Sequence, residues 1–511
     1  MGVYTALLKT VTGRRLAEFR RACATPEVSQ LAVLKRIVAR AAGTEWGRRY
    51  GYADIRDYDQ FRRRVPISQY EEMAPLWLKA CEGARDVTWP GHVDYFALSS
   101  GTTAGNKLLP VTAEAIRSNI HSGAVLLATM ATRGGFKGLV SGGMLYLGGC
   151  TTLRQRGQCL YGDASGIVAR HIPFYGRRRT WPAPDIAALT DWEEKIRRVV
   201  ERYLTADVCS VSACPSWAAM VFKEMREEAL RRGMGERTIG ELWPGLTHIV
   251  SYGMAFEPYR TAFDAYIGRP VRYVNTYSSS ETGMTAIQEE AGGPLTMIVG
   301  NGVFYEFIPA DKADQPDPPR LHIGQVQTGR DYALLVSTNG GIWAYALGDV
   351  VRFESLCPPR ITFAGRTQIM LSAFGEHVDM GMMEKAVAAA CAKTSAIVAD
   401  YTVAPRFPSP AQPRPAHRWI VEFDRPPADA SVFMAAIDAS IRAECEDYDT
   451  HRANDYGLEP PILIQVAPRT FYEWMKRKGK LGGQNKVPRV VRSPEMADEL
   501  LSISEGLAQS Q

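Results

Sequence analysis

The sequence predicts an α/β protein with a large layered N-terminal domain and a small C-terminal α+β domain. Three observations support this prediction. The 511 residues exceed what one ordinary hydrophobic core accommodates. Helical and strand periodicities alternate through roughly the first 300 residues. After that the pattern changes to closely spaced strands, and then to a shorter mixture of helices and strands.

Helical and strand segments alternate through the N-terminal part of the chain. Apolar residues recur at helical spacing over 1–45, as expected for amphipathic helices. Further helices are predicted at 113–132, 192–204 and 217–231, and short apolar strands at 144–147, 248–252 and 271–276. This alternation is typical of sheets covered by helices.

A β-rich subdomain is predicted at about 295–374. Apolar runs such as YALLVST and ITFAG have strand character, and Asn339-Gly340 between two such runs indicates a hairpin. The order predicted after it is helix 380–391, strands 396–403 and 417–423, helix 430–446 and strand 462–466. We therefore expect domains at 1–374 and 375–511, with the Pro-rich stretches 313–320 and 406–415 as exposed loops.

Composition narrows the class of protein. The chain is 46% hydrophobic and 23% charged with a net charge of +5, which favours a soluble protein and argues against nucleic-acid binding as the main activity. No run approaches the roughly 20 apolar residues of a membrane span. Nine scattered cysteines do not suggest a disulfide framework. We expect a reduced, cytoplasmic protein without a membrane or nucleic-acid partner.

The first candidate site is the run YFALSSGTTAGNKLLP. Glycines allow close backbone approach to a ligand, while hydroxyls, N–H groups and a lysine suit phosphate oxygens. Its candidate ligands are Ser99, Ser100, Gly101, Thr102, Thr103, Gly105 and Lys107. The glycine spacing differs from a Walker A loop, so a phosphate-binding loop between two strands is predicted. The alternative is an ordinary hairpin turn.

Two further candidate sites follow strands. In YSSSETG, Tyr277 and Ser280 precede Glu281, a carboxylate that could bind Mg²⁺ while phosphates complete the coordination shell. The alternative is a capped helix start with Glu281 in its first turn. In WAYALGDVV, Asp349 follows a glycine, and its two oxygens suit the vicinal hydroxyls of a ribose. The alternative is an aspartate in a turn.

Two more stretches lie further along the chain. AGRT contains Arg366 and precedes AFGE at 373–376, and GGQNKVPR contains Lys486. Because Lys486 follows two glycines and precedes a proline, it is predicted to lie on a loop. In isolation this lysine would be an ordinary solvated side chain.

Taken in order, these motifs resemble the GH3 family of acyl acid–amido synthetases, a branch of the adenylate-forming enzymes. The family's SSGT phosphate motif, with its later Gly and Lys, matches Ser99–Lys107. Its Y-x-x-SE and Y-x-x-GD motifs match Tyr277–Glu281 and Tyr345–Asp349. TEWGRRYGY, NGVFYEFIP and NKVPR also resemble the family. The likeness extends from about residue 30 to 495, and GRT followed by AFGEH is closer to the bacterial branch.

The resemblance implies a fold like that of firefly luciferase and assigns residue roles. Ser99, Ser100, Thr102, Thr103 and Lys107 would hold the phosphates of ATP. Tyr277 and Ser280 would line the nucleotide site, Glu281 would bind Mg²⁺, and Asp349 would bind the ribose. Lys486, on a mobile C-terminal domain, would act in adenylation. Two departures stand out: Ala346 replaces an arginine and His377 a lysine of the plant members.

The expected activity is therefore adenylation of a carboxylic acid by ATP and Mg²⁺, followed by acyl transfer to an amine, which the resemblance implies is an amino acid. AMP and pyrophosphate would be released. Three alternatives remain: a CoA thioester product, a metal-free acyltransferase using the HxxxD pattern at His451 and Asp455, and a binding protein without turnover. The acid, the acceptor and the oligomeric state are not specified by the sequence.

Overall fold

The computed structural model describes two compact units. Its described residues are 2–100, 106–140, 142–254, 256–313, 315–366, 370–371, 376, 378–406, 415–452, 458–481, 486–491 and 494–509. Unit 1 comprises Met1–Cys214, Leu242–Gly253 and Val271–Phe363, and unit 2 comprises Pro215–Glu241, Met254–Pro270 and Ala364–Gln511. Unit 2 thus contains two segments that precede the predicted C-terminal domain. The predicted boundary at 374/375 stays a prediction.

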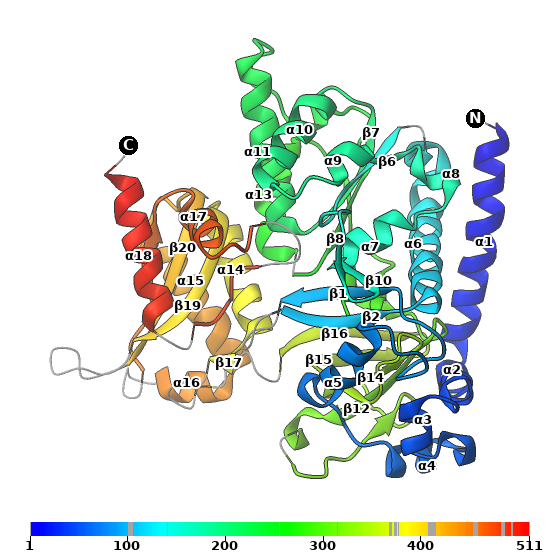
Figure 1. The fold of residues 1–511 in the computed structure, drawn as a ribbon. Helices are drawn as coiled ribbons and strands as arrows, with labels where there is room; N and C mark the ends of the chain where they lie inside the picture. Colours follow the sequence, from blue (N-terminus) through cyan, green and yellow to red (C-terminus); the bar gives the residue numbers. More distant parts are fainter. Residues whose placement is uncertain are drawn as a thin grey trace. The chain divides into compact units, whose positions relative to one another are not determined.

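One large sheet organises unit 1 (Figure 1). Within the described residues its strand order is β13-β12-β14-β15-β16-β11-β10-β9-β8-β7-β3-β6. The strands are β3 (Gly143–Leu147), β6 (Thr180–Trp181), β7 (Val208–Ala213), β8 (His248–Tyr252), β9 (Arg272–Ser279), β10 (Gly283–Gln288), β11 (Leu295–Met297), β12 (Val303–Pro309), β13 (Leu321–His322), β14 (Asp331–Thr338), β15 (Tyr345–Leu356) and β16 (Pro359–Arg366). β3, β7, β8 and β9 are parallel neighbours, whereas β9 to β11 and β12 to β15 pair antiparallel.

The parallel and antiparallel halves differ in how the chain connects their strands. Parallel neighbours require a crossover. Between β7 and β8 it includes α11 (Pro215–Arg231) and α12 (Ile239–Leu242), and between β8 and β9 it includes η2 (Glu257–Tyr259) and α13 (Arg260–Ile267). The antiparallel half uses shorter connections, and Asn339-Gly340 lies between β14 and β15, as the hairpin prediction requires.

A smaller sheet with the order β2-β1-β5-β4 completes the strands described in unit 1. They are β1 (Tyr95–Ser100), β2 (Asn106–Val111), β4 (Arg154–Arg156) and β5 (Cys159–Asp163). A disulfide joins Cys81, at the end of α5 (Tyr70–Cys81), to Cys159 of β5. The expectation that all cysteines are reduced is therefore wrong for this pair, which the cysteine pattern could not reveal because contact between positions so far apart in sequence depends on the fold.

Helices cover these sheets. They are α1 (Gly2–Ala24), α2 (Pro26–Ala41), α3 (Glu45–Arg49), η1 (Tyr52–Asp54), α4 (Tyr58–Arg64), α5, α6 (Ala113–Val140), α7 (Ala164–Arg170), α8 (Phe174–Arg177), α9 (Pro184–Ala187), α10 (Trp192–Tyr203) and η3 (Ala310–Lys312). α1 packs along α6 (Figure 1). The buried amide of Gln30 on α2 donates to Val303 O at 2.9 Å and accepts from Tyr305 N at 2.8 Å, which fixes α2 against β12.

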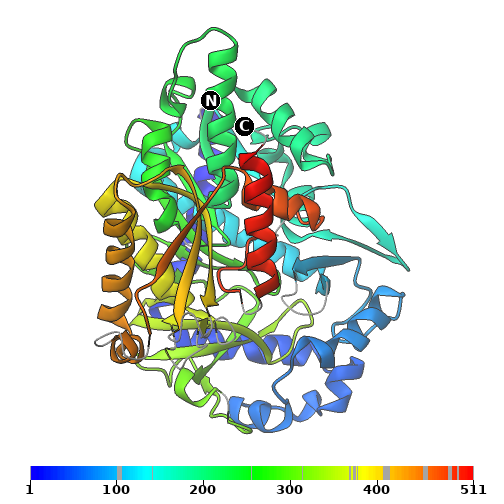
Figure 2. The same ribbon diagram turned by 90° about the vertical axis from the view of Figure 1, so that its left-hand side faces the viewer.

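Unit 2 contains a three-stranded sheet with helices on both faces. Its elements after residue 364 are β17 (Met370–Leu371), β18 (Val378–Asp379), α14 (Met380–Thr394), β19 (Ile397–Arg406), β20 (Ala416–Arg425), α15 (Ala430–Glu444), α16 (Glu446–Arg452), β21 (Ile462–Val466), α17 (Thr470–Arg477) and α18 (Pro494–Ala508). The order is β19-β20-β21. Alternate residues of β20 divide between two cores, with Trp419 facing α14 and α15 and Ile420 facing α17 and α18. Figure 2 shows α18 in red and α15 in orange on opposite sides of the strands.

These elements confirm the predicted mixed α/β class. Strands β8 and β21 have the predicted bounds, and the helix predicted at 113–132 continues to Val140. Among the described residues, no helix combines the length and the apolar character needed to cross a membrane.

Candidate functional site

The predicted phosphate-binding loop joins two antiparallel strands. Ser99 on β1 lies opposite Lys107 on β2, and Ser100 lies opposite Asn106. The connecting residues, which include the predicted Gly101, Thr102, Thr103 and Gly105, lie outside the described residues. The strand–loop–strand arrangement agrees with the prediction and differs from the strand–loop–helix of a Walker A site.

Tyr70 supports Lys107. The Lys107 ammonium lies 5.2 Å from the centre of the Tyr70 ring, within the range of a cation–π interaction. The Tyr70 hydroxyl accepts a hydrogen bond from the backbone N–H of Leu108 at 3.0 Å. One tyrosine therefore contacts both the lysine side chain and the adjoining strand. Sequence reasoning did not identify Tyr70, which has no motif around it.

The second and third motifs meet in the large sheet. The Tyr277 hydroxyl on β9 donates to Oδ2 of Asp349 on β15 at 2.5 Å. Asp349 is buried, with 4% exposure, and the Tyr277 ring lies 6.0 Å from that of Phe363 on β16. A hydrogen bond to a carboxylate is stronger than one between neutral groups, so Tyr277 fixes the orientation of Asp349.

Ser280 and Glu281 lie in the turn between β9 and β10. The strands pair Ser279 with Gly283, so the alternative of a helix start at Glu281 is wrong. Ser279 and Thr282 share a hydroxyl hydrogen bond of 2.9 Å. Gly283 has φ +69°, and a Cβ at this position would lie 1.8 Å from Asn119 Oδ1. Glycine is therefore required at the end of this turn.

An aromatic chain connects the surroundings of the first and third motifs. The Tyr70 ring lies 6.0 Å from that of Trp77, and Trp77 lies 6.0 Å from Tyr345, the first residue of β15. Both separations are within the range of favourable ring contacts. Ala346, the departure from the plant motif, is held through its backbone N–H, which donates to Ser68 O at 2.9 Å.

The carboxylate and hydroxyl groups of the turn between β9 and β10 suit a magnesium ion whose other ligands come from a substrate. Among the described residues, no group of three His, Cys, Asp or Glu side chains is arranged to hold a metal ion. Mg²⁺ in nucleotide sites commonly uses one or two carboxylates together with substrate phosphates. The half-buried Glu281, in a turn rich in hydroxyls, suits that mode of binding.

The remaining predicted residues belong to unit 2. Arg366 is the last residue of β16, and only its backbone is described. Lys486 is exposed and begins the described segment 486–491. His377, the other departure, lies outside the described residues. The neighbouring Glu376 is buried, and its carboxylate contacts His417 Nε2 at 2.9 Å.

The carboxyl ends of the parallel strands β3, β8 and β9 lie close together in unit 1. The Tyr252 hydroxyl at the end of β8 donates to Leu147 O at the end of β3, at 3.1 Å. Ser251 donates to Asn275 on β9. Burial raises the pKa of Tyr146 to about 12, so its hydroxyl keeps its proton at neutral pH. Such strand ends are the usual ligand sites of parallel sheets.

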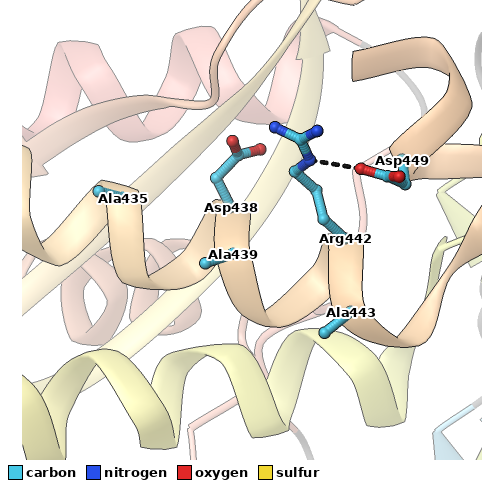
Figure 3. A pocket seen from close by; sticks show the side chains of 6 residues that line it. All are labelled: Ala435, Asp438, Ala439, Arg442, Ala443 and Asp449. Carbon is cyan, nitrogen blue, oxygen red and sulfur yellow. Dashed lines mark hydrogen bonds and ion pairs between the residues drawn. The ribbon is translucent and has the colours of Figure 1, made fainter. Parts of the chain in front are cut away.

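A pocket in unit 2 is not one of the predicted sites. It is lined by Ala435, Asp438, Ala439, Arg442, Ala443 and Asp449 (Figure 3). Its charged groups are paired within the protein: Arg442 donates to Asp449 at 2.5 Å, and Asp438 accepts from Tyr448 and Arg452. These pairs stabilise α15 and α16, and no predicted site residue lines this pocket.

Three domain models of one protein family match this chain, one after another along the sequence. The N-terminal, central and C-terminal domain models of the GH3 family match residues 15–195, 296–366 and 382–495. Indole-3-acetic acid-amido synthetase GH3.8 of Oryza sativa subsp. indica is 24% identical over 92% of this chain and 89% of its own length. Probable indole-3-acetic acid-amido synthetase GH3.1 of Oryza sativa subsp. japonica is 26% identical over 92% and 88%. These relatives are plant enzymes and give no support to the predicted bacterial branch.

Solved structures confirm the predicted fold. The AtGH3.15 acyl acid amido synthetase in complex with 2,4-DB has a TM-score of 0.79 at 19% identity, covering 96% of each chain. A 2-hydroxyisobutyryl-CoA ligase in its postadenylation state has a TM-score of 0.56 at 13% identity, covering 97% of this chain and 92% of its own. Because the three domain models of one family match in order, the chain belongs to the GH3 family.

Proposed function

We propose that this chain is an ATP- and Mg²⁺-dependent ligase that adenylates a carboxylic acid and transfers the acyl group to an amino acid. Membership of the GH3 family supports this proposal, as do relatives named as indole-3-acetic acid-amido synthetases. The main structural support is the hydrogen bond between Tyr277 and Asp349. It joins two motifs that the family resemblance assigns to one nucleotide.

The proposed nucleotide contacts follow from the chemistry of each side chain. Hydroxyls and backbone N–H groups from Ser99 to Thr103, together with Lys107, would bind the phosphates. Tyr277 and Ser280 would line the site, and the carboxylate of Asp349 would accept hydrogen bonds from the ribose hydroxyls. Arg366 would add a positive charge near the nucleotide. Glu281 would hold Mg²⁺, which when bound supplies positive charge against the phosphate oxygens.

The first half-reaction is a substitution at phosphorus. A carboxylate oxygen of the acid forms a bond to the α-phosphorus of ATP, and the bond from that phosphorus to the bridging oxygen breaks, releasing pyrophosphate. Lys107 and Lys486 would stabilise the negative charge that develops on the phosphate oxygens. The remaining contribution of the protein is alignment of acid and nucleotide.

The second half-reaction forms the amide. The amine nitrogen attacks the acyl carbon, the bond to the phosphate oxygen breaks, AMP leaves, and the nitrogen loses a proton. In the proposed cycle the C-terminal domain, residues 375–511, changes position between the two steps.

A cytoplasmic location and membership of the bacterial branch of the GH3 family remain part of the proposal.

A screen of carboxylic acids against amino acids tests this function. Indole-3-acetic acid and 2,4-DB are the first acids, because they occur in the names of the relatives. Release of pyrophosphate should require both ATP and an acid, and amide should form when an amino acid is added. CoA in place of the amino acid distinguishes a thioester-forming enzyme.

Variants define the controls of the screen. Lys107→Ala and Glu281→Ala should abolish acid-dependent pyrophosphate release. Lys79→Ala, which removes an exposed lysine paired with Glu45 in the same unit, should leave it unchanged. Full turnover by the Lys107 or Glu281 variant would refute the assigned site, and ATP binding without turnover for any acid would indicate a binding protein.

A further inference from the structure

The segment that carries Lys486 lies along one edge of the unit 2 sheet. The backbone of Val403 on β19 donates to Arg489 O at 2.9 Å and accepts from Val491 N at 2.8 Å. The Thr402 hydroxyl donates to Pro488 O at 2.6 Å. Val403 and Val490 form a parallel bridge. Residues 488–491 therefore extend the sheet beyond β19.

Burial alternates along this extended segment. Val487, Arg489 and Val491 are buried, with 7%, 6% and 4% exposure, whereas Lys486 and Pro488 are exposed. In an extended chain, successive side chains point to opposite sides. The three buried residues and the backbone bonds to Val403 set the register, in which Lys486 is exposed. Val490, on the same side as Lys486, is half-buried against α14 and α15. If the segment slipped by one residue along β19, its buried side chains would become exposed and its exposed side chains would become buried.

Arg489 is the polar member of the buried set. Its guanidinium donates to Asp400 Oδ1, to Tyr401 O at 2.7 Å and to the Tyr259 hydroxyl at 2.9 Å. The guanidinium carbon lies 4.2 Å from the centre of the Tyr401 ring. Burial alone would lower the pKa of Arg489, but Tyr259 and Asp400 hold it above its ordinary value. The side chain is therefore a charged anchor with several fixed partners.

We propose that Arg489 is a positioning residue for the adenylation half-reaction, because it fixes the register that presents Lys486. The inference rests on the proposed function, which assigns Lys486 to that step. The backbone bonds to Val403 and the buried valines place the segment against β19, but the apolar contacts among them are not directional. A planar guanidinium bound to three partners adds a directional constraint on this register, and lysine cannot reproduce its geometry.

Comparison of Lys486→Ala, Arg489→Lys and the double variant tests the inference. Adenylation is followed by pyrophosphate exchange with the acid that gives the highest rate in the screen above. Transfer is followed by amide formation from that acid's preformed acyl-adenylate and an amino acid. We expect Arg489→Lys to lower the adenylation rate by at least roughly tenfold while transfer changes by less than about twofold, since positioning losses fall on the step that uses the group.

The double variant separates positioning from a purely structural role. If Arg489 acts through Lys486, the double variant should be within about twofold of Lys486→Ala, because residues acting as one unit are not additive. Multiplicative losses, or equal losses in both half-reactions, would overturn the inference. Wild-type protein without acid-dependent exchange would instead refute the proposed function.

Arg452→Lys is the matched control. Arg452 is also buried in unit 2, paired with Asp438 and bound to Leu458 O, but it is far along the chain from Lys486. Its variant should keep wild-type adenylation per folded molecule, and a loss equal to that of Arg489→Lys would contradict the inference. If Arg489→Lys does not fold, Asp400→Asn removes the charged partner more mildly and should show the same selective loss. Equal rates for Asp400→Asn and wild type would then overturn it.

Discussion

Both units bury an arginine against a carboxylate, but the two arginines have different neighbours along the chain. In unit 1, Arg320 pairs with both oxygens of Glu306 at 2.9 and 2.8 Å and donates to Val65 O at 2.5 Å. These contacts hold the end of α4 against β12. In unit 2, Arg489 contacts one oxygen of Asp400 and also Tyr401 O, and Lys486 lies three residues before it.

With the proposed role of Lys486, the same kind of interaction supports the fold in unit 1 and a reaction in unit 2. The segments around Arg320 contain no predicted site residue, so its contacts contribute to stability. The exposed Lys486 lies three residues before Arg489, so in the proposal the contacts of Arg489 also determine where that lysine points. Removing each arginine should therefore affect different measurements.

The largest effect is expected for Arg320→Ala. It leaves Glu306 as an unpaired buried carboxylate, and the free energy of unfolding of unit 1 should fall by about 3–5 kcal/mol. Urea denaturation measures this loss. Arg330→Ala, which removes an exposed pair with Asp311, should cost less than about 1 kcal/mol. Equal losses for the two variants would contradict the distinction between buried and exposed pairs.

Lys486→Ala should act on chemistry and leave stability unchanged. Loss of a charged group that stabilises the transition state typically lowers kcat about 100- to 1000-fold, and we expect this loss in pyrophosphate exchange. Transfer from a preformed acyl-adenylate should stay near the wild-type rate. Lys385→Ala, an exposed lysine of the same unit paired with Glu444, is the control. An unchanged rate of pyrophosphate exchange in Lys486→Ala would contradict the proposed role of Lys486 in adenylation.

The two units should respond to pH in opposite directions. Burial and then Arg272 lower the pKa of His248 in unit 1 to about 4, so its contribution to stability is present above about pH 6.5 and is lost as the pH falls toward 4, by about 3 kcal/mol. Burial raises the pKa of Glu422 in unit 2 to about 7. Its contribution is present below about pH 4.5 and is lost as the pH rises through 7.

Hydrogen exchange of each unit between pH 4 and 8 measures this difference. His248→Gln should reduce the loss of unit 1 stability at acid pH. Glu422→Gln should reduce the loss of unit 2 stability as the pH rises to neutral. If the stability of both units depended on pH in the same way, groups other than His248 and Glu422 would determine that dependence.

The smallest effects concern the pair Asp349 and Tyr277. Hydrogen bonds to charged groups contribute about 1.5–3 kcal/mol, so Asp349→Asn should raise the KM for ATP about 10- to 100-fold. Tyr277→Phe removes only the hydrogen bond that orients Asp349 and should raise KM about two- to tenfold. Wild type should prefer ATP to its 2′-deoxy analogue, and Asp349→Asn should lose that preference. A preference that persists would place the ribose elsewhere.

Local patterns in the sequence were sufficient for some of the strands, such as β8 and β21, and for the order of the motifs, but they did not reveal β5, β7 or β10. The hairpin of β1 and β2, around the predicted phosphate-binding loop, could be predicted because apolar strands flank a run of Ser, Thr and Gly. The strand β8 and the antiparallel pairing at Asn339-Gly340 depend on periodicity and turn chemistry, which are also local.

Contacts between distant segments were not predictable in this way. Tyr70 contacts Lys107, and Cys81 pairs with Cys159, only because α5 packs beside the small sheet. The assignment of α11 and α13 to unit 2 depends on tertiary packing. Glu281 was compatible with a helix start until the pairing of β9 with β10 placed it in a turn.

The left-handed turn at Gly283 limits which amino acids this position tolerates. Alanine would need both a positive φ and displacement of the Asn119 side chain on α6. In a library of all single substitutions we expect only glycine at this position, whereas Gly292, also at positive φ but with open space around its Cα, should accept asparagine. Asn119→Ala should remove the clash between its side chain and a Cβ at residue 283. The positive φ at this position should still favour glycine. Sequence variation at residues 119 and 283 should therefore be coupled across the turn that carries Glu281.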